Sequence, residues 1–391
     1  MNKTIAIIGA GISGLTAGCA LKKQYKATTI YERSENIEEF GAGVTLSPNA
    51  TRLLGRLGVL KKIKKAGSLP KKIILREHSS GKEMVSLSIN NPEMDSFITV
   101  DRRDLIKVLL SIFQDSGGVV ETSREVSEID LHNNKIKFSS SKEEAADLVI
   151  ACDGIKSGIR EKHFDSSSPI FSNFFAWRGI ADKKYLPHLK GINEINVYYG
   201  PEAHVVHYPT GPEGKISFVG IRKSKIWAKE SWKEEGSKEK FLKDFSGWNE
   251  ELLKFMVSPK KIYKWGLFER LKSQNIQKKH IILMGDAAHP MVPFLGQGGC
   301  MAIEDAYTFQ LLCLELDNQK KVLDLYEKIR LRRGNWIQTR SKLQAKFNHL
   351  SNPLLVKARK LFLGYMSLNS LKAVHSYDAH QETINALQKQ A

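Results

Sequence analysis

A glycine-rich turn near the N-terminus constrains the fold of this chain more than any other feature. The apolar run from Thr4 to Ile8 leads into Gly9-Ala10-Gly11-Ile12-Ser13-Gly14, and a helix-forming sequence follows. This order of strand, tight turn and helix is typical of sites where a pyrophosphate meets a helix N-terminus. Gly9 can take the turn, Gly11 leaves the backbone open to phosphates, and Gly14 lets the helix pack on the strand. The motif therefore predicts a dinucleotide-binding strand and helix.

A second strand supplies a carboxylate where a ribose is expected. The segment from Thr28 to Tyr31 is rich in β-branched and aromatic residues, and it ends at Glu32, eighteen residues after Gly14. A carboxylate at this position accepts hydrogen bonds from ribose hydroxyls and repels a 2′-phosphate. Glu32, with Arg33 beside it, is therefore expected to bind the adenosine half of the dinucleotide.

Two later strands end in acidic turns. The run from Asp147 to Cys152 leads into Asp153-Gly154, and the run from Ile281 to Met284 leads into Gly285-Asp286. Because ligands bind at the carboxyl ends of strands in open α/β sheets, both turns are expected at one ligand-binding edge. Asp286 can accept a hydrogen bond from a sugar or ribityl hydroxyl.

A second glycine-rich loop follows at residues 293–299 and starts another helix. Its segment Gly296-Gln297-Gly298-Gly299 places backbone N–H groups at a helix N-terminus, where they can face a ring carbonyl or an anion. Near a flavin, this positive end of a helix dipole would stabilise the anionic reduced ring. Two such loops in one chain favour a bound cofactor over two unrelated turns.

Composition restricts the other classes of partner. The chain has 391 residues, enough for two or three domains, and 60 Lys and Arg against 42 Asp and Glu give a net charge of +18. The lysines are scattered as pairs, so a solvated surface is favoured over specific nucleic-acid binding. The four cysteines show neither Cys-x-x-Cys nor metal-ligand spacing, so no metal site is expected and reduced thiols suggest a cytoplasmic location. No apolar run reaches eighteen residues, so no spanning helix is expected.

Hydrophobic periodicity divides the chain into three kinds of segment. Strand-then-helix patterns at 1–70, 101–165 and 276–320 predict a discontinuous, Rossmann-like nucleotide domain of the α/β class. Alternating patterns at 71–100 and 166–275 predict an inserted, mostly antiparallel β-sheet domain for the substrate. Residues 321–391 are expected to form a C-terminal helical region, whose turn signals are Gly334, Asn352-Pro353 and Gly364.

Local sequence patterns predict two further helices. Leucines at helical spacing predict one helix from Ala50 to Lys65. Asp101 is expected to cap a helix that extends to about Phe113.

The three motifs together carry a family resemblance. Gly9-x-Gly11-x-x-Gly14, Asp153-Gly154 and Gly285-Asp286 resemble, in order and spacing, the single-component FAD-dependent aromatic hydroxylases, similar to para-hydroxybenzoate and salicylate hydroxylases. The resemblance extends through residue 340. It implies a monooxygenase that uses FAD, NAD(P)H and O2, and that hydroxylates a small electron-rich aromatic such as a phenol, a hydroxybenzoate or a salicylate-like compound through a flavin C4a-hydroperoxide.

The resemblance also implies which residues contact the cofactor. Arg102 would lie beside the flavin, Val126 would meet the adenine through its backbone, and Asp286 would bind the ribityl chain. Asp153-Gly154 is associated with both FAD and NAD(P)H. The residues implied in cofactor binding are Gly9, Gly11, Gly14, Glu32, Arg33, Gly43, Thr45, Arg102, Val126, Asp153, Gly154, Gly285, Asp286, Pro293, Gly296, Gln297, Gly298 and Gly299.

The predicted substrate sheet supplies the candidates for acid–base chemistry. His204 and Tyr208 are four residues apart on one predicted strand, so they share a face, whereas His207 points the other way. The pair resembles a His-x-x-x-Tyr-Pro segment of some family members in which both residues face the substrate. His204 and Tyr208 are therefore the candidate catalytic residues.

Other polar and aromatic residues of this region are assigned structural roles. Arg178 is interpreted as a charge on a strand surface, with the binding of a substrate carboxylate as the alternative. The four tryptophans Trp227, Trp232, Trp248 and Trp265 are interpreted as packing residues.

Some alternatives stay open at this stage. One alternative is a hydroxylase of a ubiquinone precursor or an epoxidase of an isoprenoid, since the basic helices after residue 340 could contact a membrane surface weakly or line an apolar pocket. A flavin-binding or nucleic-acid-binding protein without turnover is suggested only by the charge. Monomer and homodimer, and NADH and NADPH, are not distinguished.

Overall fold

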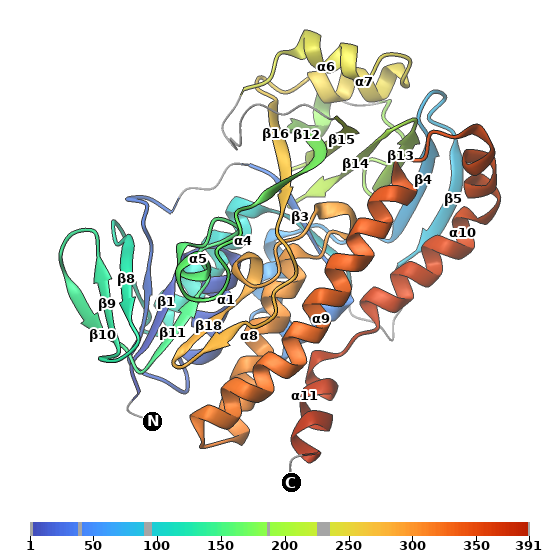
Figure 1. Cartoon of the computed structure of the whole chain (residues 1–391). Helices are drawn as coiled ribbons and strands as arrows, with labels where there is room; N and C mark the ends of the chain where they lie inside the picture. Colours follow the sequence, from blue (N-terminus) through green and yellow to red (C-terminus); the bar gives the residue numbers. More distant parts are fainter. Residues whose placement is uncertain (1–2, 38–40, 90–95, 186–187, 225–234, 390–391) are drawn as a thin grey trace.

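The computed structural model describes residues 3–37, 41–89, 96–185, 188–224 and 235–389, and two large sheets dominate it (Figure 1). Trp227 and Trp232 lie outside the described residues. A six-stranded sheet carries the glycine motifs, and a seven-stranded sheet carries the candidate catalytic residues.

The six-stranded sheet has the order β17-β18-β11-β1-β2-β7. All its pairs are parallel except β17 with β18, which closes one edge. Every residue of β1 and β11 is buried, as expected for a parallel sheet that is covered on both faces. The strands are β1 (Ile5–Ile8), β2 (Thr28–Tyr31), β7 (Val119–Glu121), β11 (Leu148–Ala151), β17 (Gln277–Lys278) and β18 (Ile281–Leu283).

Helices cover this sheet and set its glycine turns. The almost wholly buried α1 (Ile12–Leu21) packs against α4 (Arg102–Asp115) and α8 (Gly298–Glu315). Asp101 caps α4 by accepting a hydrogen bond of 2.9 Å from the Arg103 N–H, which confirms the predicted cap. The shorter α5 (Gly158–His163) follows β11, and α11 (Ala379–Gln388) packs on α8.

Two small sheets join the larger parts. The strands β8 (Val126–Asp130), β9 (Lys135–Phe138) and β10 (Glu143–Ala145) form an antiparallel meander between β7 and β11. The pair β3 (Gly43–Leu46) and β6 (Ile98–Asp101) lies between the glycine motifs and the second large sheet (Figure 1).

The seven-stranded sheet has the order β16-β12-β15-β14-β13-β4-β5. Its pairs are antiparallel except for β4 with β13. Its strands are β4 (Lys72–Glu77), β5 (Glu83–Ser88), β12 (Ile170–Asp182), β13 (Ile195–Gly200), β14 (Ala203–Thr210), β15 (Lys215–Lys223) and β16 (Tyr263–Glu269), and a 3₁₀ turn (Lys183–Tyr185) follows β12.

The two faces of this sheet differ. The helices α6 (Lys238–Asp244) and α7 (Glu250–Val257) cover one face, where Phe241 and Phe255 pack with Trp177 and Phe218. The other face is turned toward the glycine motifs and toward α9 (Gln319–Asn348) and α10 (Pro353–His375) (Figure 1). Together the sheets and the helical C-terminal region confirm the predicted α/β class with an inserted, mostly antiparallel sheet. The residue boundaries of the domains stay a prediction.

Two local predictions were wrong. The helix expected from Ala50 to Lys65 is two helices, α2 (Pro48–Arg56) and α3 (Leu60–Ala66), because Gly58 between them adopts a φ of +79°. Gly334 is not a turn but lies inside the thirty-residue helix α9. A Cβ atom there would lie 2.1 Å from Nδ1 of the buried His289, so only glycine lets α9 pass this close.

Buried charges attach α9 to α8. The Arg330 guanidinium contacts Asp305 Oδ1 at 2.7 Å through Nε and Glu304 Oε2 at 2.9 Å through Nη2, and all three side chains are fully buried. Arg333 also contacts Glu304, at 3.1 Å. Burial alone would raise the pKa of both carboxyls, but the nearby arginines, and His289 beside Asp305, outweigh it and lower both pKa values. No helix among the described residues is both long and apolar enough to cross a membrane.

Replacing Arg330 by Met should lower the free energy of unfolding by about 3–5 kcal/mol, because it leaves Asp305 and Glu304 charged in a buried site. Chemical denaturation followed by circular dichroism measures this change. As a control, Lys62→Met removes an ion pair with Asp115 whose side chains are 59% and 61% exposed, so the midpoint should barely move. Equal shifts for both variants would contradict the assignment.

Candidate active site

The glycine turn after β1 is shaped by its neighbours. Gly9 has a φ of +104°, and a Cβ atom there would lie 2.6 Å from the Cys152 carbonyl oxygen. A Cβ atom on Gly14 would lie 1.9 Å from the Gly9 oxygen, so the helix start cannot accept a side chain. At Gly11, in contrast, a Cβ atom would meet no atom of the described part of the chain within 4 Å. The turn is thus closely packed on the protein side and open at Gly11, where a pyrophosphate is expected.

The carboxylate of Glu32 is held beside this turn. Glu32 Oε2 accepts a 2.8 Å hydrogen bond from the Ala10 N–H, and its Oε1 accepts one of 3.0 Å from the Ser34 N–H. The Glu32 carboxylate is therefore held beside the glycines, with lone pairs left for a ribose. Arg33, the next residue, is exposed. The Arg124 N–H donates to the Glu32 carbonyl oxygen at 2.8 Å. The half-buried Val126 begins β8 two residues later.

Asp153 is a buried acceptor that the protein does not fully satisfy. Its Oδ1 atom has no hydrogen-bond partner among the described residues, while its Oδ2 atom accepts weakly from the Ile159 N–H at 3.4 Å. Burial raises the pKa of Asp153, although Ser157 and Arg33 act in the opposite direction. The following Gly154 turns with a φ of +80°. A hydroxyl donor from a bound cofactor would satisfy this carboxyl.

The turn after β18 faces the same edge. Gly285, in a short 3₁₀ turn (Gly285–Ala287), adopts a φ of +58° and donates its N–H to Asp305 Oδ2 at 2.8 Å. Asp286 lines the cavity, and the surrounding protein raises its pKa by desolvation, while Arg102 lowers it. The nearest atom to a Cβ on Gly298 would be Asp286 Oδ1, at 3.9 Å. Asp286 therefore lies beside the N-terminus of α8.

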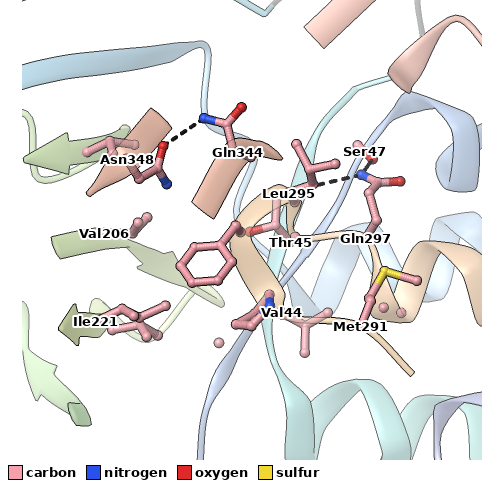
Figure 2. A pocket seen from close by; sticks show the side chains of 18 of the residues that line it. Val44, Thr45, Ser47, Val206, Ile221, Met291, Leu295, Gln297, Gln344 and Asn348 are labelled. Atoms are coloured by element: carbon pink, nitrogen blue, oxygen red, sulfur yellow. Dashed lines mark hydrogen bonds between the residues drawn. The ribbon is translucent and has the colours of Figure 1, made fainter. Parts of the chain in front are cut away.

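The buried side chain of Gln297 supports the loop before α8. A third 3₁₀ turn (Pro293–Leu295) ends at Gly296, whose φ is +63°, and α8 then begins. Gln297 is buried, and its Nε2 donates to Ser47 Oγ at 2.9 Å (Figure 2). Its Oε1 accepts from Asn49 at 2.9 Å. The Gln297 side chain thus supports the loop, while Gly296, Gly298 and Gly299 leave its outer surface open.

A cavity of about 440 Å³ lies between this loop and the seven-stranded sheet. In Figure 2, Val44, Thr45 and Gln297 lie on one side of it, and Val206, Ile221 and Asn348 lie on the other. The predicted site residues that line it are Gly43, Thr45, Arg102, His204, Tyr208, Asp286, Pro293, Gly296, Gln297, Gly298 and Gly299. The cavity thus brings the predicted flavin loops and the predicted catalytic residues together.

Tyr208 packs directly on the loop that carries Gly43. A Cβ atom on Gly43 would lie 2.3 Å from Tyr208 Cε2, and the Gly43 N–H donates to Ser217 Oγ at 2.9 Å. Burial raises the pKa of Tyr208 to about 12, although hydrogen bonds with Thr45 and Ser217 act against it. The Tyr208 hydroxyl is therefore protonated at neutral pH and can both donate and accept a hydrogen bond.

His204 is paired with a histidine that the sequence did not reveal. His204 Nδ1 lies 3.1 Å from Nε2 of His349, and His349 Nδ1 lies 2.7 Å from the Ala345 carbonyl oxygen. Because a carbonyl oxygen only accepts, His349 Nδ1 carries the proton and its Nε2 is an acceptor. His204 Nδ1 must then donate, which leaves a lone pair on His204 Nε2.

Burial keeps this pair neutral. His204 is 3% exposed, and burial lowers its pKa well below the usual value, with His349 and Arg359 adding to the shift. Burial also lowers the pKa of His349, to about 4. His204 is thus an uncharged hydrogen-bond acceptor at neutral pH. His207, on the opposite face of β14, packs against Phe255 instead.

One interpretation from the sequence was wrong at this site. Arg178 is not a surface charge, because it is 4% exposed and lines the cavity. Trp265 is a packing residue, as predicted, because it is buried in a hydrophobic cluster. Its ring also borders the cavity, and the Arg178 guanidinium carbon lies 4.0 Å from the centre of that ring. The signal was present in β12: the aromatic Trp177 faces α6, so its neighbour Arg178 must face the other side.

Comparisons with known proteins agree with this geometry. The family model described as an FAD binding domain matches residues 2–341. The 3-amino-4-hydroxybenzoate 2-monooxygenase PtmB3 of Streptomyces platensis is 30% identical over 88% of both chains, and the 6-hydroxynicotinate 3-monooxygenase of Pseudomonas fluorescens is 27% identical over 85% of this chain and 89% of its own. A solved salicylate hydroxylase substrate complex is similar in fold, with a TM-score of 0.82, 23% identity and 98% of both chains covered.

The fold, the cofactor edge and the family match define an FAD-dependent flavoprotein. The chain belongs to the family of FAD-dependent aromatic monooxygenases that carry this FAD binding domain. The residues present fit FAD: Gly11 and Gly298 leave room for it, and the unsatisfied Asp153 carboxyl and the enclosed Asp286 carboxyl provide acceptors for its hydroxyl groups.

Two glycine substitutions should separate cofactor binding from folding. Gly11→Val should leave the unfolding temperature of the FAD-free protein nearly unchanged, since a Cβ atom at this position would meet no atom of the described residues within 4 Å. It should nevertheless abolish the yellow colour of purified protein by blocking the pyrophosphate. Gly14→Ala should lower that temperature as well, because its Cβ atom meets the Gly9 oxygen at 1.9 Å. Flavin absorbance per protein and thermal unfolding measure both; normal flavin content in Gly11→Val would contradict the assignment.

Proposed function

We propose that this enzyme hydroxylates an electron-rich aromatic ring, such as a phenol, a hydroxybenzoate or a hydroxypyridine, with NAD(P)H and O2 as co-substrates. The observation that carries this proposal is the single cavity in which His204, Tyr208 and Arg178 face the open glycine loop before α8. When bound, FAD supplies the redox chemistry by which NAD(P)H and O2 are consumed. The curated relatives support the proposal, since their names refer to hydroxylated benzoates and nicotinates.

The protein groups have distinct tasks in this proposal. His204 Nε2 accepts a hydrogen bond from the ring hydroxyl of the substrate, which makes the ring more electron-rich. Tyr208, fixed against Gly43, holds the substrate oxygen from the side of the flavin loop. The guanidinium of Arg178, stacked on Trp265, stabilises a negative charge on the substrate. The apolar lining excludes water from the reacting region.

Expectations about partners and location stay predictions. The exposed apolar residues of α10, such as Leu361 at 82% and Tyr365 at 72%, are consistent with weak contact to an anionic membrane, which sedimentation with anionic vesicles would test. Light scattering would distinguish monomer from homodimer. A cytoplasmic location and the absence of a specific nucleic-acid partner also remain predictions.

A substrate screen tests the proposed reaction. Purified holoenzyme is incubated with NADH or NADPH and with phenols, hydroxybenzoates and hydroxypyridines, and nicotinamide oxidation, peroxide and hydroxylated product are measured together. At least one of these aromatics should stimulate oxidation and yield a product that has gained one oxygen atom. Stimulation that yields only peroxide for every aromatic would contradict the proposal.

Variants of His349 test the role given to His204. His349→Leu removes the acceptor that fixes the His204 tautomer, so kcat for hydroxylation should fall by about tenfold or more while KM changes little. His349→Gln restores an acceptor oxygen and should recover most of the activity. Because burial lowers the pKa of both histidines, that of His349 to about 4, wild-type activity should lose no contribution from this pair until the pH falls toward 4. Equal losses in both variants would show a merely structural role.

A further inference from the structure

The part of the cavity that lies farthest from the flavin loops is lined by aliphatic side chains. Gly43 contacts Tyr208 on β14 and Ser217 on β15, so the cofactor edge faces the β12, β15 and β14 side of the sheet. Beyond β14, the cavity continues over β13, β4 and β5 and under α10. This continuation, named here the aliphatic arm, is lined by Ile73, Leu75, Leu87, Ile195, Val197 and Leu371.

One row of paired residues crosses the sheet along the arm. The strand registers place the following residues side by side from β12 to β4: Arg178, Val219, Val206, Val197 and Leu75. All five line the cavity. Because neighbouring strands lie about 4.8 Å apart, the row extends for roughly 19 Å from a cation to an aliphatic end.

A single aromatic ring would leave part of the apolar half of this row uncovered. Stacked or packed aromatic rings lie about 5 Å apart, so one ring covers about one strand spacing. The apolar surface that stays accessible is that of the half-buried Val206 and Val197, because Leu75 is 2% exposed and packs with Leu363. Apolar surface of this kind gains binding energy only when an apolar group covers it.

The wall opposite the row carries no charge either. Among the described lining residues of α10, Ser367, Ser370, Leu371 and Val374 have no ionisable side chain, and the same holds for β5 and for the aliphatic lining residues of β4 and β13. His375, at the end of α10, also lines the cavity, and burial lowers its pKa to about 3, so it is neutral at neutral pH. A carboxylate placed in the arm would lose its water without gaining a counter-ion, which is strongly unfavourable. The arm therefore favours an uncharged apolar group over a second carboxylate.

Polar contacts are available where the arm begins. Gln344 Nε2 donates to Asn348 Oδ1 at 2.7 Å, and both residues line the cavity above Val206 (Figure 2). Asn348 is 3% exposed, and its Nδ2 group makes no hydrogen bond to another described residue. The amide can thus donate to a polar group that joins the ring to an apolar substituent.

From this arrangement we propose that the substrate is an aromatic ring that carries an extended apolar substituent, and that the substituent lies along the aliphatic arm. The proposal rests on the proposed function, because the ring is placed at His204, Tyr208 and Arg178. The compounds in the names of the curated relatives are compact acids, so this substrate class distinguishes the chain from them.

The test uses binding as well as turnover. The FAD-bound enzyme is titrated with phenol and with 3- and 4-alkylphenols from ethyl to hexyl, and Kd is taken from the change in flavin absorbance. Each fully buried methylene strengthens binding by about fourfold, so a butylphenol of the better series should bind at least about tenfold more tightly than phenol. Affinity that does not rise with chain length in either series would overturn the proposal.

A matched pair of variants locates the effect. Leu371→Trp fills the arm from α10 and should reduce the gain from the butyl group to about twofold or less, with phenol binding little changed. Val197→Trp fills it from the sheet and should act in the same way. Leu368→Trp, on the same helix but 40% exposed, should keep the full gain. If the gain survives in both filled variants, or is lost in Leu368→Trp, the substituent does not lie in the arm.

The two proposals fail in different ways. Graded binding of alkylphenols without oxygenated product from any aromatic would overturn the hydroxylase function and leave the arm assigned. Hydroxylation of phenol and alkylphenols with equal Kd and equal kcat/KM would leave the function and overturn the arm.

Discussion

The cluster of buried charges between α8 and α9 is the interaction on which the cofactor edge depends. Arg330 neutralises Asp305, and Asp305 accepts a hydrogen bond from the Gly285 N–H in the turn that carries Asp286. Arg333 and Arg330 neutralise Glu304, which accepts a 2.7 Å hydrogen bond from Asn49. Through Asn49 the same cluster reaches Gln297 and the glycine loop. Turns from distant parts of the chain are thus fixed by one set of ion pairs that water cannot screen.

Because side chains alternate along each strand, one face of the seven-stranded sheet packs in the core and the other face lines the cavity. On β14, Val205 and His207 point to the aromatic core under α6 and α7, while His204, Val206 and Tyr208 line the cavity. The core side is closely packed by phenylalanine and tryptophan rings, so the sheet is rigid and its other side need not be filled. A cavity beside a rigid sheet can hold its shape without a ligand.

The features set by local chain geometry were predictable from the sequence. The glycine turn, the acidic turns after β11 and β18, and the shared face of His204 and Tyr208 follow from spacing alone, and the structure places them around one cavity. Contacts between residues far apart in sequence were not predictable. Nothing near His349 or Asn348 in the sequence indicates that the end of α9 reaches β14.

The role of a single glycine was difficult to predict from the sequence where tertiary packing determines that role. Gly58 ends a helix through its positive φ, whereas Gly334 allows a helix to continue past a buried imidazole. Both are single glycines in leucine-rich and lysine- or arginine-rich surroundings, so their local sequences do not distinguish them. Only the position of His289, contributed from the turn after β18, explains the second.

The length of α9 has a mechanical consequence. Arg330 anchors the helix at the cofactor edge, and eighteen residues later Asn348 and His349 reach the substrate cavity. At 1.5 Å per residue this is a stiff rod of about 27 Å. A small tilt at its anchored end is therefore magnified at its far end, where it changes the distance between two imidazole rings. The helix therefore links the ion pairs beneath the cofactor edge to the position of His349, the hydrogen-bond partner of His204.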